Sequence, residues 1–151
     1  MNDRRQKRLE LLKRLREMNM EQARSEHVAA NAELEQRREK ADQTEQRIES
    51  LDAWTVERLS QGSTLSPELL QQTRLFRGVE KHSLDQQRGD ETQQREVTET
   101  ARRALTVRFE ELSVVERLAL RHAEQMNHEQ LRRGFVELDE AGIRKSLEPK
   151  E

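Results

Sequence analysis

The feature that most constrains this chain is that its first 59 residues contain neither Gly nor Pro. These are the two residues that most strongly disfavour a helix interior. From Met20 onward, a spacing of three and four residues can be followed, as in a helix that packs along a partner helix. The positions on this seam are Met20, Ala23, His27, Ala30, Leu34, Arg37, Ala41, Thr44, Ile48, Leu51 and Thr55. Seven of the eleven are apolar, which predicts one long helix over about residues 3–59.

Turn signals follow directly after this run. Gly62 can end a helix in a left-handed conformation. Ser66 is suited to cap the next helix, Pro67 to its first position and Glu68 to the positive end of its dipole. We therefore predict a turn over about residues 60–66 and a second helix over about 67–146. A short loop favours antiparallel neighbours, so residue i should lie opposite about residue 126 − i. The predicted fold is all-α: two long helices forming an antiparallel coiled-coil hairpin, with residues 1–151 as a single domain.

The composition agrees with a helical hairpin and excludes an ordinary globule. Hydrophobic residues make up 32% of the chain and charged residues 38%, against about 45–50% and about 25% in a typical domain. Disorder is the rival interpretation, but disordered chains are usually rich in Pro and Gly, and this one has two Pro and five Gly. The net charge of -2 predicts no bulk attraction to nucleic acid. There is no Cys, no apolar run long enough for a membrane span and no signal-peptide pattern, so we expect a cytoplasmic protein without membrane insertion.

Large apolar side chains are concentrated in two zones that are joined by a polar middle. Beside the turn, the expected pairing places Ile48, Leu51 and Trp54 opposite Leu75, Phe76 and Val79. Near the chain ends it places Leu9, Leu12 and Leu15 opposite Leu112, Val115 and Leu118. The side chains of each zone either pack the two helices together or leave part of their apolar surface exposed for a partner protein. Trp, the residue at position 54, is among the types most favoured in contacts with a partner.

Two further segments allow both a plain and a functional interpretation. The second helix should extend beyond the first, and Leu131, Phe135 and Leu138 there follow the i, i+4, i+7 spacing. This stretch either frays or lies in a groove of a partner. The first sixteen residues hold seven basic side chains against two acidic ones. Arg4, Arg5 and Arg8 therefore form either a solvated face or a docking surface for an acidic partner.

The sequence contains no recognisable reactive site. It has no phosphate-binding loop, dinucleotide-binding glycine pattern or zinc signature. His27 and His122 fall on seam positions, where a polar residue more often sets the register of a coiled coil than binds metal. We therefore predict no catalytic, cofactor-binding or metal-binding residue, and we do not expect an enzyme.

Together these features resemble a known family. The basic N-terminus, the turn near residue 63, the longer second helix and the Leu/Trp/Phe cluster beside the turn are similar to the FliJ/YscO/HrpO group of central stalk proteins of type III secretion systems. The resemblance covers the whole chain in architecture, and it slightly favours the injectisome branch (YscO, HrpO) over the flagellar one. It implies a non-enzymatic stalk at the cytoplasmic face of the secretion apparatus.

The resemblance also implies partners. The terminal end of such a stalk enters the pore of a hexameric secretion ATPase, and its tip reaches the export gate membrane protein; secretion chaperones and the stator protein are further partners. Carried onto this sequence, the ATPase-binding residues would be Arg4, Arg5, Arg8, Leu12, Leu131 and Phe135. The gate-binding residues would be Leu51, Trp54, Leu75, Phe76, Val79 and His82. The family often has Tyr near the tip of the first helix, and Trp54 would replace it here because this chain has no Tyr.

Two other classes fit a helical hairpin. A prefoldin-like chaperone would need β-strands at the turn, and the segment Gln61 to Ser66 is too short to supply them. A generic coiled-coil scaffold would be indicated by concentration-dependent association of the purified protein.

Overall fold

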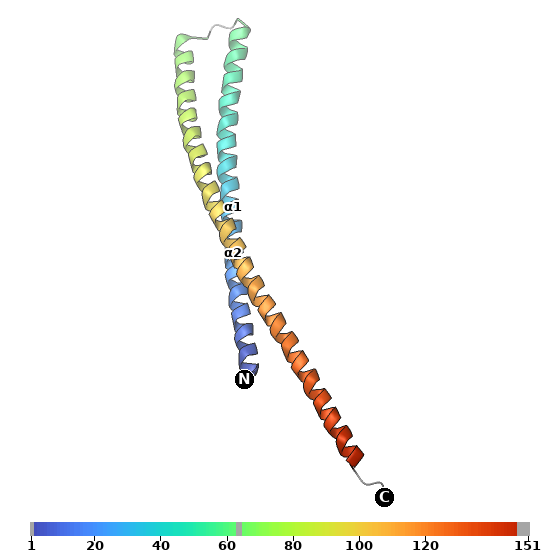
Figure 1. Ribbon diagram of the computed structural model, residues 1–151. Coiled ribbons are helices and arrows are strands. Elements are labelled where there is room, and N and C mark those ends of the chain that lie inside the picture. The colour runs from blue at the N-terminus through green and yellow to red at the C-terminus, as the bar shows by residue number, and fades with distance from the viewer. Residues whose placement is uncertain (1, 63–64, 148–151) are drawn as a thin grey trace. The chain divides into compact units, whose positions relative to one another are not determined.

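The computed structural model describes residues 2–62 and 65–147, and over them the chain forms two antiparallel α-helices (Figure 1). Helix α1 spans Asn2–Ser60 and helix α2 spans Pro67–Leu147. The described part of the chain contains no strand. The predicted all-α helical hairpin is therefore confirmed.

By its packing, the chain divides into two compact units. The hairpin unit is Gln22–Thr106, and the terminal unit is Met1–Glu21 together with Val107–Glu151. The single domain predicted over 1–151 includes Met1 and residues 148–151, which lie outside the described residues, and it stays a prediction.

Local hydrogen bonds explain where the helices meet the turn. Gly62 has a φ of 69° and donates from its amide to the Leu59 carbonyl at 3.4 Å, as a glycine that ends a helix does. On the other side, the Ser66 hydroxyl accepts a hydrogen bond of 3.2 Å from the Leu69 amide and so caps α2. Ser63 and Thr64, which belong to the predicted turn, lie outside the described residues.

Small and polar side chains fill the interface of the hairpin unit. Helix α1 buries Ala23, Ala41, Thr44 and Ile48, which all lie on the expected seam. Helix α2 buries Glu91, Gln94 and Thr98 instead of apolar residues. The seam of α1 thus follows the expected spacing, whereas the facing side of α2 is polar.

The terminal unit has a more apolar interface. Helix α2 buries Leu112, Val115 and His122 there, and Leu9 and Leu12 of α1 are half-buried. The expectation that Leu15 and Leu118 also face the partner helix is wrong, because they are 51% and 46% exposed. Neither residue lies on the three-and-four seam, so the helical repeat turns both away from the interface.

Cross-helix hydrogen bonds define the register in each unit. In the hairpin unit, Arg47 Nε donates to Glu80 at 3.1 Å, and in the terminal unit, Arg16 Nη1 donates to Glu111 at 2.8 Å. Each partner lies one residue from the position that the expected pairing gives. The sequence-based register is therefore correct to within one residue at these two places.

Candidate partner-binding surfaces

The tip of the hairpin unit carries a shallow apolar groove. Leu51, Trp54 and Phe76 line it together with the polar residues Gln43, Gln46, Arg47 and Ser50. Trp54 is half-buried, and the guanidinium carbon of Arg58 lies 5.5 Å from the centroid of its ring. Phe76 is 53% exposed. The structure thus brings three of the six residues proposed for the tip together on one surface.

The other three tip residues are exposed. Leu75 and Val79 are 65% and 68% exposed, and His82 is also exposed. The expected packing of Leu75 and Val79 against α1 is therefore wrong. The α2 seam in this region includes Glu80 and Leu84, and Leu75 and Val79 lie outside it. Both residues belong to an apolar zone of the sequence, but membership of a zone does not determine which face of the helix a residue occupies.

Ion pairs hold the helices together near the tip. Arg77 of α2 donates two hydrogen bonds to Asp52 of α1, at 2.7 and 3.1 Å. These bonds hold the pKa of the Asp52 carboxyl below its ordinary value of 3.8, and they raise the pKa of Arg77. Both side chains are 44% exposed, so the pair fixes geometry more than it adds stability.

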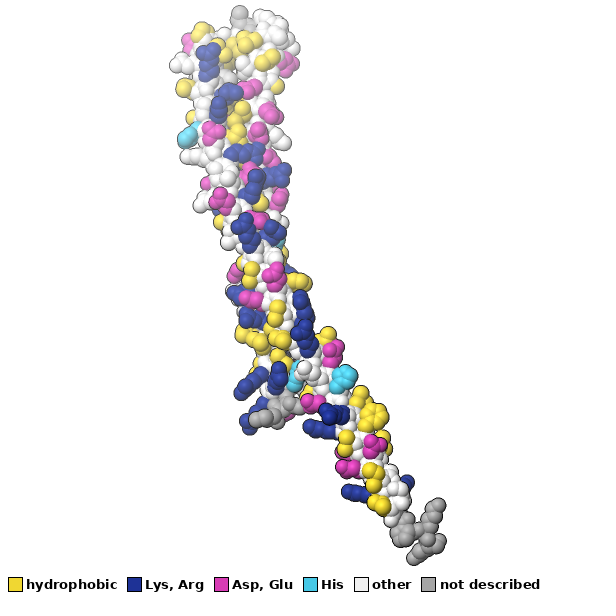
Figure 2. Space-filling model, viewed as in Figure 1, with side chains coloured by type: hydrophobic (Ala, Val, Ile, Leu, Met, Phe, Trp, Pro, Cys, Tyr) yellow, Lys and Arg dark blue, Asp and Glu magenta, His cyan; other side chains and the backbone are white. Residues whose placement is uncertain are grey.

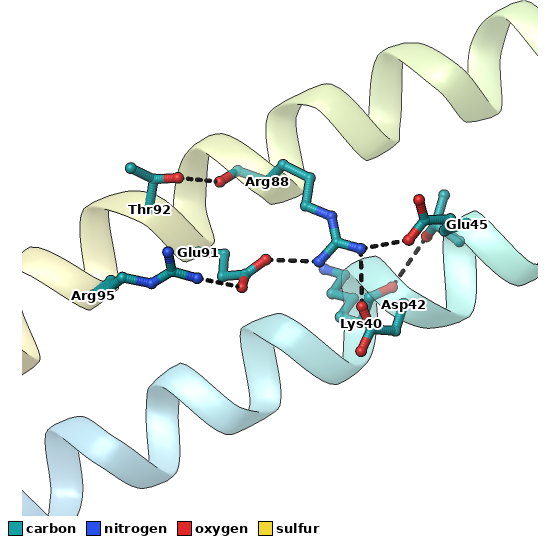
Figure 3. Close-up of polar contacts among 8 residues, drawn as sticks. Lys40, Asp42, Glu45, Arg88, Glu91, Thr92 and Arg95 are labelled. Carbon is teal, nitrogen blue, oxygen red and sulfur yellow. Dashed lines mark hydrogen bonds and ion pairs between the residues drawn. The ribbon is translucent and has the colours of Figure 1, made fainter.

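Arg88 is the centre of a polar network in the middle of the hairpin unit. Its guanidinium points from α2 toward α1 and donates to Glu91, Asp42 and Glu45, at 2.8, 2.8 and 2.6 Å (Figure 3). The hydrogen bond to Glu91 is the largest cause of a raised Arg88 pKa. The Glu91 side chain is only 8% exposed and also accepts from Arg95 at 3.1 Å. A buried carboxylate is thus paired with two cations.

A second polar contact lies further along the same interface. The Gln94 amide nitrogen and the Thr98 hydroxyl both donate to the Ala30 carbonyl, at 3.0 and 3.1 Å. These contacts were not predicted, because the sequence pattern shows this middle only as poor in apolar residues. The expected pairing places Asp42 opposite residue 84, one helical turn from Arg88. Opposite charges within one turn of each other were the signal that could have indicated the network.

The terminal unit contains a groove of about 310 Å³ between the start of α1 and α2. Its lining residues are Gln6, Leu9, Glu10, Lys13, Ala119, His122, Ala123, Met126, Asn127 and Gln130. His122 is 7% exposed, and its Nε2 atom has no hydrogen-bond partner among the described residues. Sequence reasoning placed His122 on the seam but did not identify the groove.

The residues proposed for the terminal end are mostly exposed. Arg4, Arg5 and Arg8 are all exposed, and Figure 2 shows Lys and Arg side chains gathered around the N-terminal end of α1. Leu131 and Phe135 are 61% and 67% exposed, and they border a shallow groove on α2. Leu12, by contrast, is half-buried.

Neither helix, over its described residues, has an apolar stretch of the length that a membrane span requires. No group of three or more His, Cys, Asp or Glu side chains in those residues could hold a metal ion.

Comparison with known proteins places this arrangement in a family. Residues 5–151 match the family model described as flagellar FliJ protein. No curated protein and no solved structure matches the chain. The match names the flagellar member of the group, so it gives no support to the slight preference for the injectisome branch. Because the match covers nearly the whole length of a two-helix chain, this protein belongs to the FliJ family.

Proposed function

We propose that this chain is the non-enzymatic central stalk of a type III export apparatus, flagellar or injectisome. Its terminal unit binds the pore of the hexameric secretion ATPase, and its tip binds the export gate. Family membership supports the stalk role. The observation that carries the division of labour is that exposed large apolar side chains are frequent beside the turn and near the chain ends but sparse between them. In that middle Val28 and Val97 are exposed, and the buried α2 residues Glu91, Gln94 and Thr98 are polar.

The terminal unit presents both basic and apolar surface, through which it would bind the ATPase pore. Arg4, Arg5 and Arg8 are exposed cations that steer association with an acidic surface. Leu131 and Phe135 add exposed apolar surface that can be buried on binding. Leu12 is half-buried, so it would contribute to the terminal unit's binding surface mainly by packing between the two helices.

The tip offers an anchor for the gate. Trp54 stands in an open groove beside Leu51 and Phe76, and aromatic side chains in such places carry much of the binding energy of an interface. Leu75 and Val79 extend the apolar surface, and His82 adds an exposed polar group. Secretion chaperones and the stator protein are further proposed partners, and the proposed location is the cytoplasmic face of the apparatus.

A stalk of this kind acts only through binding. It can change ATP turnover only if it binds the conformational states of the ATPase with unequal affinity. The polar contacts around Arg88 then serve to keep the two helices in one register. They would prevent α1 and α2 from sliding along each other when a partner binds one end.

The terminal contact is tested with charge reversal. We expect Arg4, Arg5 and Arg8 changed together to Glu to weaken binding to the purified hexameric ATPase and to reduce its salt dependence. The matched control changes Arg38, Arg74 and Lys81, three exposed basic residues of the hairpin unit, to Glu. It gives the same change in net charge. Equal binding by both variants at low salt would show that the N-terminal residues are only a solvated face.

The tip contact is tested separately. We expect Phe76→Ala to weaken binding to the cytoplasmic part of the gate protein while leaving ATPase stimulation unchanged. Val28→Ala, a 61% exposed position of the hairpin unit away from the groove, is the matched control. If neither the tip variant nor the terminal variant alters its assigned interaction, the chain is better described as a generic coiled-coil scaffold.

A further inference from the structure

Helix α2 carries an exposed apolar stripe near its C-terminal end. Leu131, Phe135 and Leu138 are 61%, 67% and 69% exposed, and they share one face because they follow the i, i+4, i+7 spacing. Gly142 is the next position on the same face. A helix with such a stripe and no partner is marginally stable in water, so the stripe is expected to be covered.

Two glycines on or beside the stripe have no role in the packing of the chain itself. A Cβ atom added at Gly134 or at Gly142 would have no other atom within 4 Å. Gly is nevertheless disfavoured inside helices relative to Ala. At Gly134, the missing side chain borders a shallow groove that Leu131, Phe135 and Leu138 also line. Small residues on an apolar face allow a second helix to approach closely.

We propose that two copies of this chain associate by antiparallel pairing of residues 131–142 of α2. In this register, Phe135 of each copy packs against Leu138 of the other. Leu131 of each copy packs against Gly142 of the other, so that a large side chain enters the space a glycine leaves. Each large apolar side chain thereby meets either another or a gap of matching size.

The charges beside the stripe select this orientation. Arg132 and Asp139 lie on one flank of the stripe, and Gly134 and Ala141 lie on the other. In an antiparallel pair, like flanks face each other, so Arg132 of each copy meets Asp139 of the other. In a parallel pair, Phe135 would face Phe135 and Gly142 would face Gly142, and Arg132 would have no acidic partner opposite.

The helix that best covers this stripe is the same stripe of a second copy, and not a helix of another protein that is strongly acidic or strongly basic. The stretch 128–145 contains four basic and four acidic residues, and the two signs stand on the same flank in self-complementary order. A strongly acidic or strongly basic helix would meet repulsion at half of them. Because only three large apolar side chains per copy are buried, the dimer should be weak, with a dissociation constant of roughly micromolar to millimolar size. The pairing goes beyond the stalk function, and it would cover Leu131 and Phe135 whenever they are not bound elsewhere. Since a generic scaffold would also associate, the ATPase-binding test above, and not self-association alone, separates the stalk from a scaffold.

Sedimentation equilibrium over a wide range of protein concentration tests the charge pairing. We expect Arg132→Asp and Asp139→Arg each to weaken self-association by about tenfold, because each places like charges opposite one another. The double variant should recover the wild-type association. Arg133→Asp, one position along and turned away from the stripe, is the matched control and should change little. A wild-type chain that stays monomeric at the highest concentration, or a double variant that fails to recover, would overturn the proposal.

Disulfide formation tests the register, since the natural chain has no Cys. A mixture of the Leu131→Cys and Gly142→Cys proteins should form mixed dimers on oxidation, because the two positions are opposite in the antiparallel pair. Neither protein alone should cross-link, because like positions are then separated along the axis by about 11 residues, or roughly 16 Å. Cross-linking of each protein alone without mixed dimers would indicate parallel pairing and refute the register. No cross-linking in any sample would refute the interface. Circular dichroism of each variant verifies that the helices are retained.

Discussion

Arg88 of α2 donates a hydrogen bond of 2.8 Å to Asp42 of α1, across an interface where the facing α2 side chains are polar. The same guanidinium also neutralises the buried Glu91. The two helices are therefore joined in the middle of the hairpin unit by a charged group with a defined geometry. Such a contact adds modest stability, but it disfavours other registers, in which Arg88 would lose Asp42 and Glu45 of α1 and keep only Glu91 of its own helix.

Replacing Arg88 should destabilise the hairpin unit. We expect Arg88→Ala to lower the free energy of unfolding by about 1 kcal/mol, because Glu91 keeps only Arg95 as a cation. The contribution of the more exposed Asp42 and Glu45 should be small. Urea unfolding followed by circular dichroism measures the change. Arg102→Ala, which breaks exposed contacts to Glu99 within α2, is the control and should lower the free energy of unfolding less than Arg88→Ala does.

His122 should be a site where an apolar residue stabilises the protein. Its Nε2 atom is buried without a partner among the described residues, and Met126 and Leu9 line the same groove. We expect His122→Leu to raise the free energy of unfolding by about 1 kcal/mol, because a buried polar atom is replaced by an apolar group of similar size. His128→Leu, at an exposed position, is the control. A fall in stability for His122→Leu would mean that the imidazole has a polar partner in solution.

The Asp52–Arg77 pair should have a measurable effect in acid. A carboxyl whose pKa is lower in the folded chain than in the unfolded one stabilises the fold above the unfolded pKa. That contribution is lost as the pH falls through the folded pKa, below about pH 4. NMR titration should give Asp52 a pKa below 3.8, and Arg77→Gln should move it back toward that value. An Asp52 pKa that does not respond to Arg77→Gln would rule out the hydrogen bonds as its cause.

Trp54 can hold the tip closed, bind a partner, or do both, and two measurements separate these roles. Because Trp54 is only half-buried, we expect Trp54→Ala to cost about 1 kcal/mol of stability. As an interface anchor, it should weaken gate binding by about 2 kcal/mol, or roughly thirtyfold. Unfolding experiments and a binding titration on the same protein give both values. A large loss of stability with unchanged binding would assign Trp54 to the closure of the hairpin only.

Much of the fold could be predicted because its signals are local. The absence of Gly and Pro before Ser60 and the sequence Ser66-Pro67-Glu68 each act through the backbone of neighbouring residues. The pairing register followed from the turn because a short loop leaves little freedom in how two helices return along each other. It was correct to within one residue at Arg47 and at Arg16.

The candidate surfaces were harder to predict because they depend on which face a residue occupies. Leu75 and Val79 belong to an apolar zone in the sequence, but the helical repeat turns them to solvent. The Arg88 network depends on how far a long side chain reaches across the interface. Spacing along one helix contains no direct information about that reach, which is set by the partner helix.

The tip groove has a consequence for how this protein can be studied. Trp54 is the only Trp, and the chain has no Tyr, so the near-ultraviolet emission of the whole protein arises beside Leu51 and Phe76. The charge of Arg58 near the ring makes that emission sensitive to small local changes. A partner that covers the groove would shift the spectrum, whereas one that binds only the terminal unit would leave it unchanged. The molecule therefore contains its own optical reporter for the occupancy of one end.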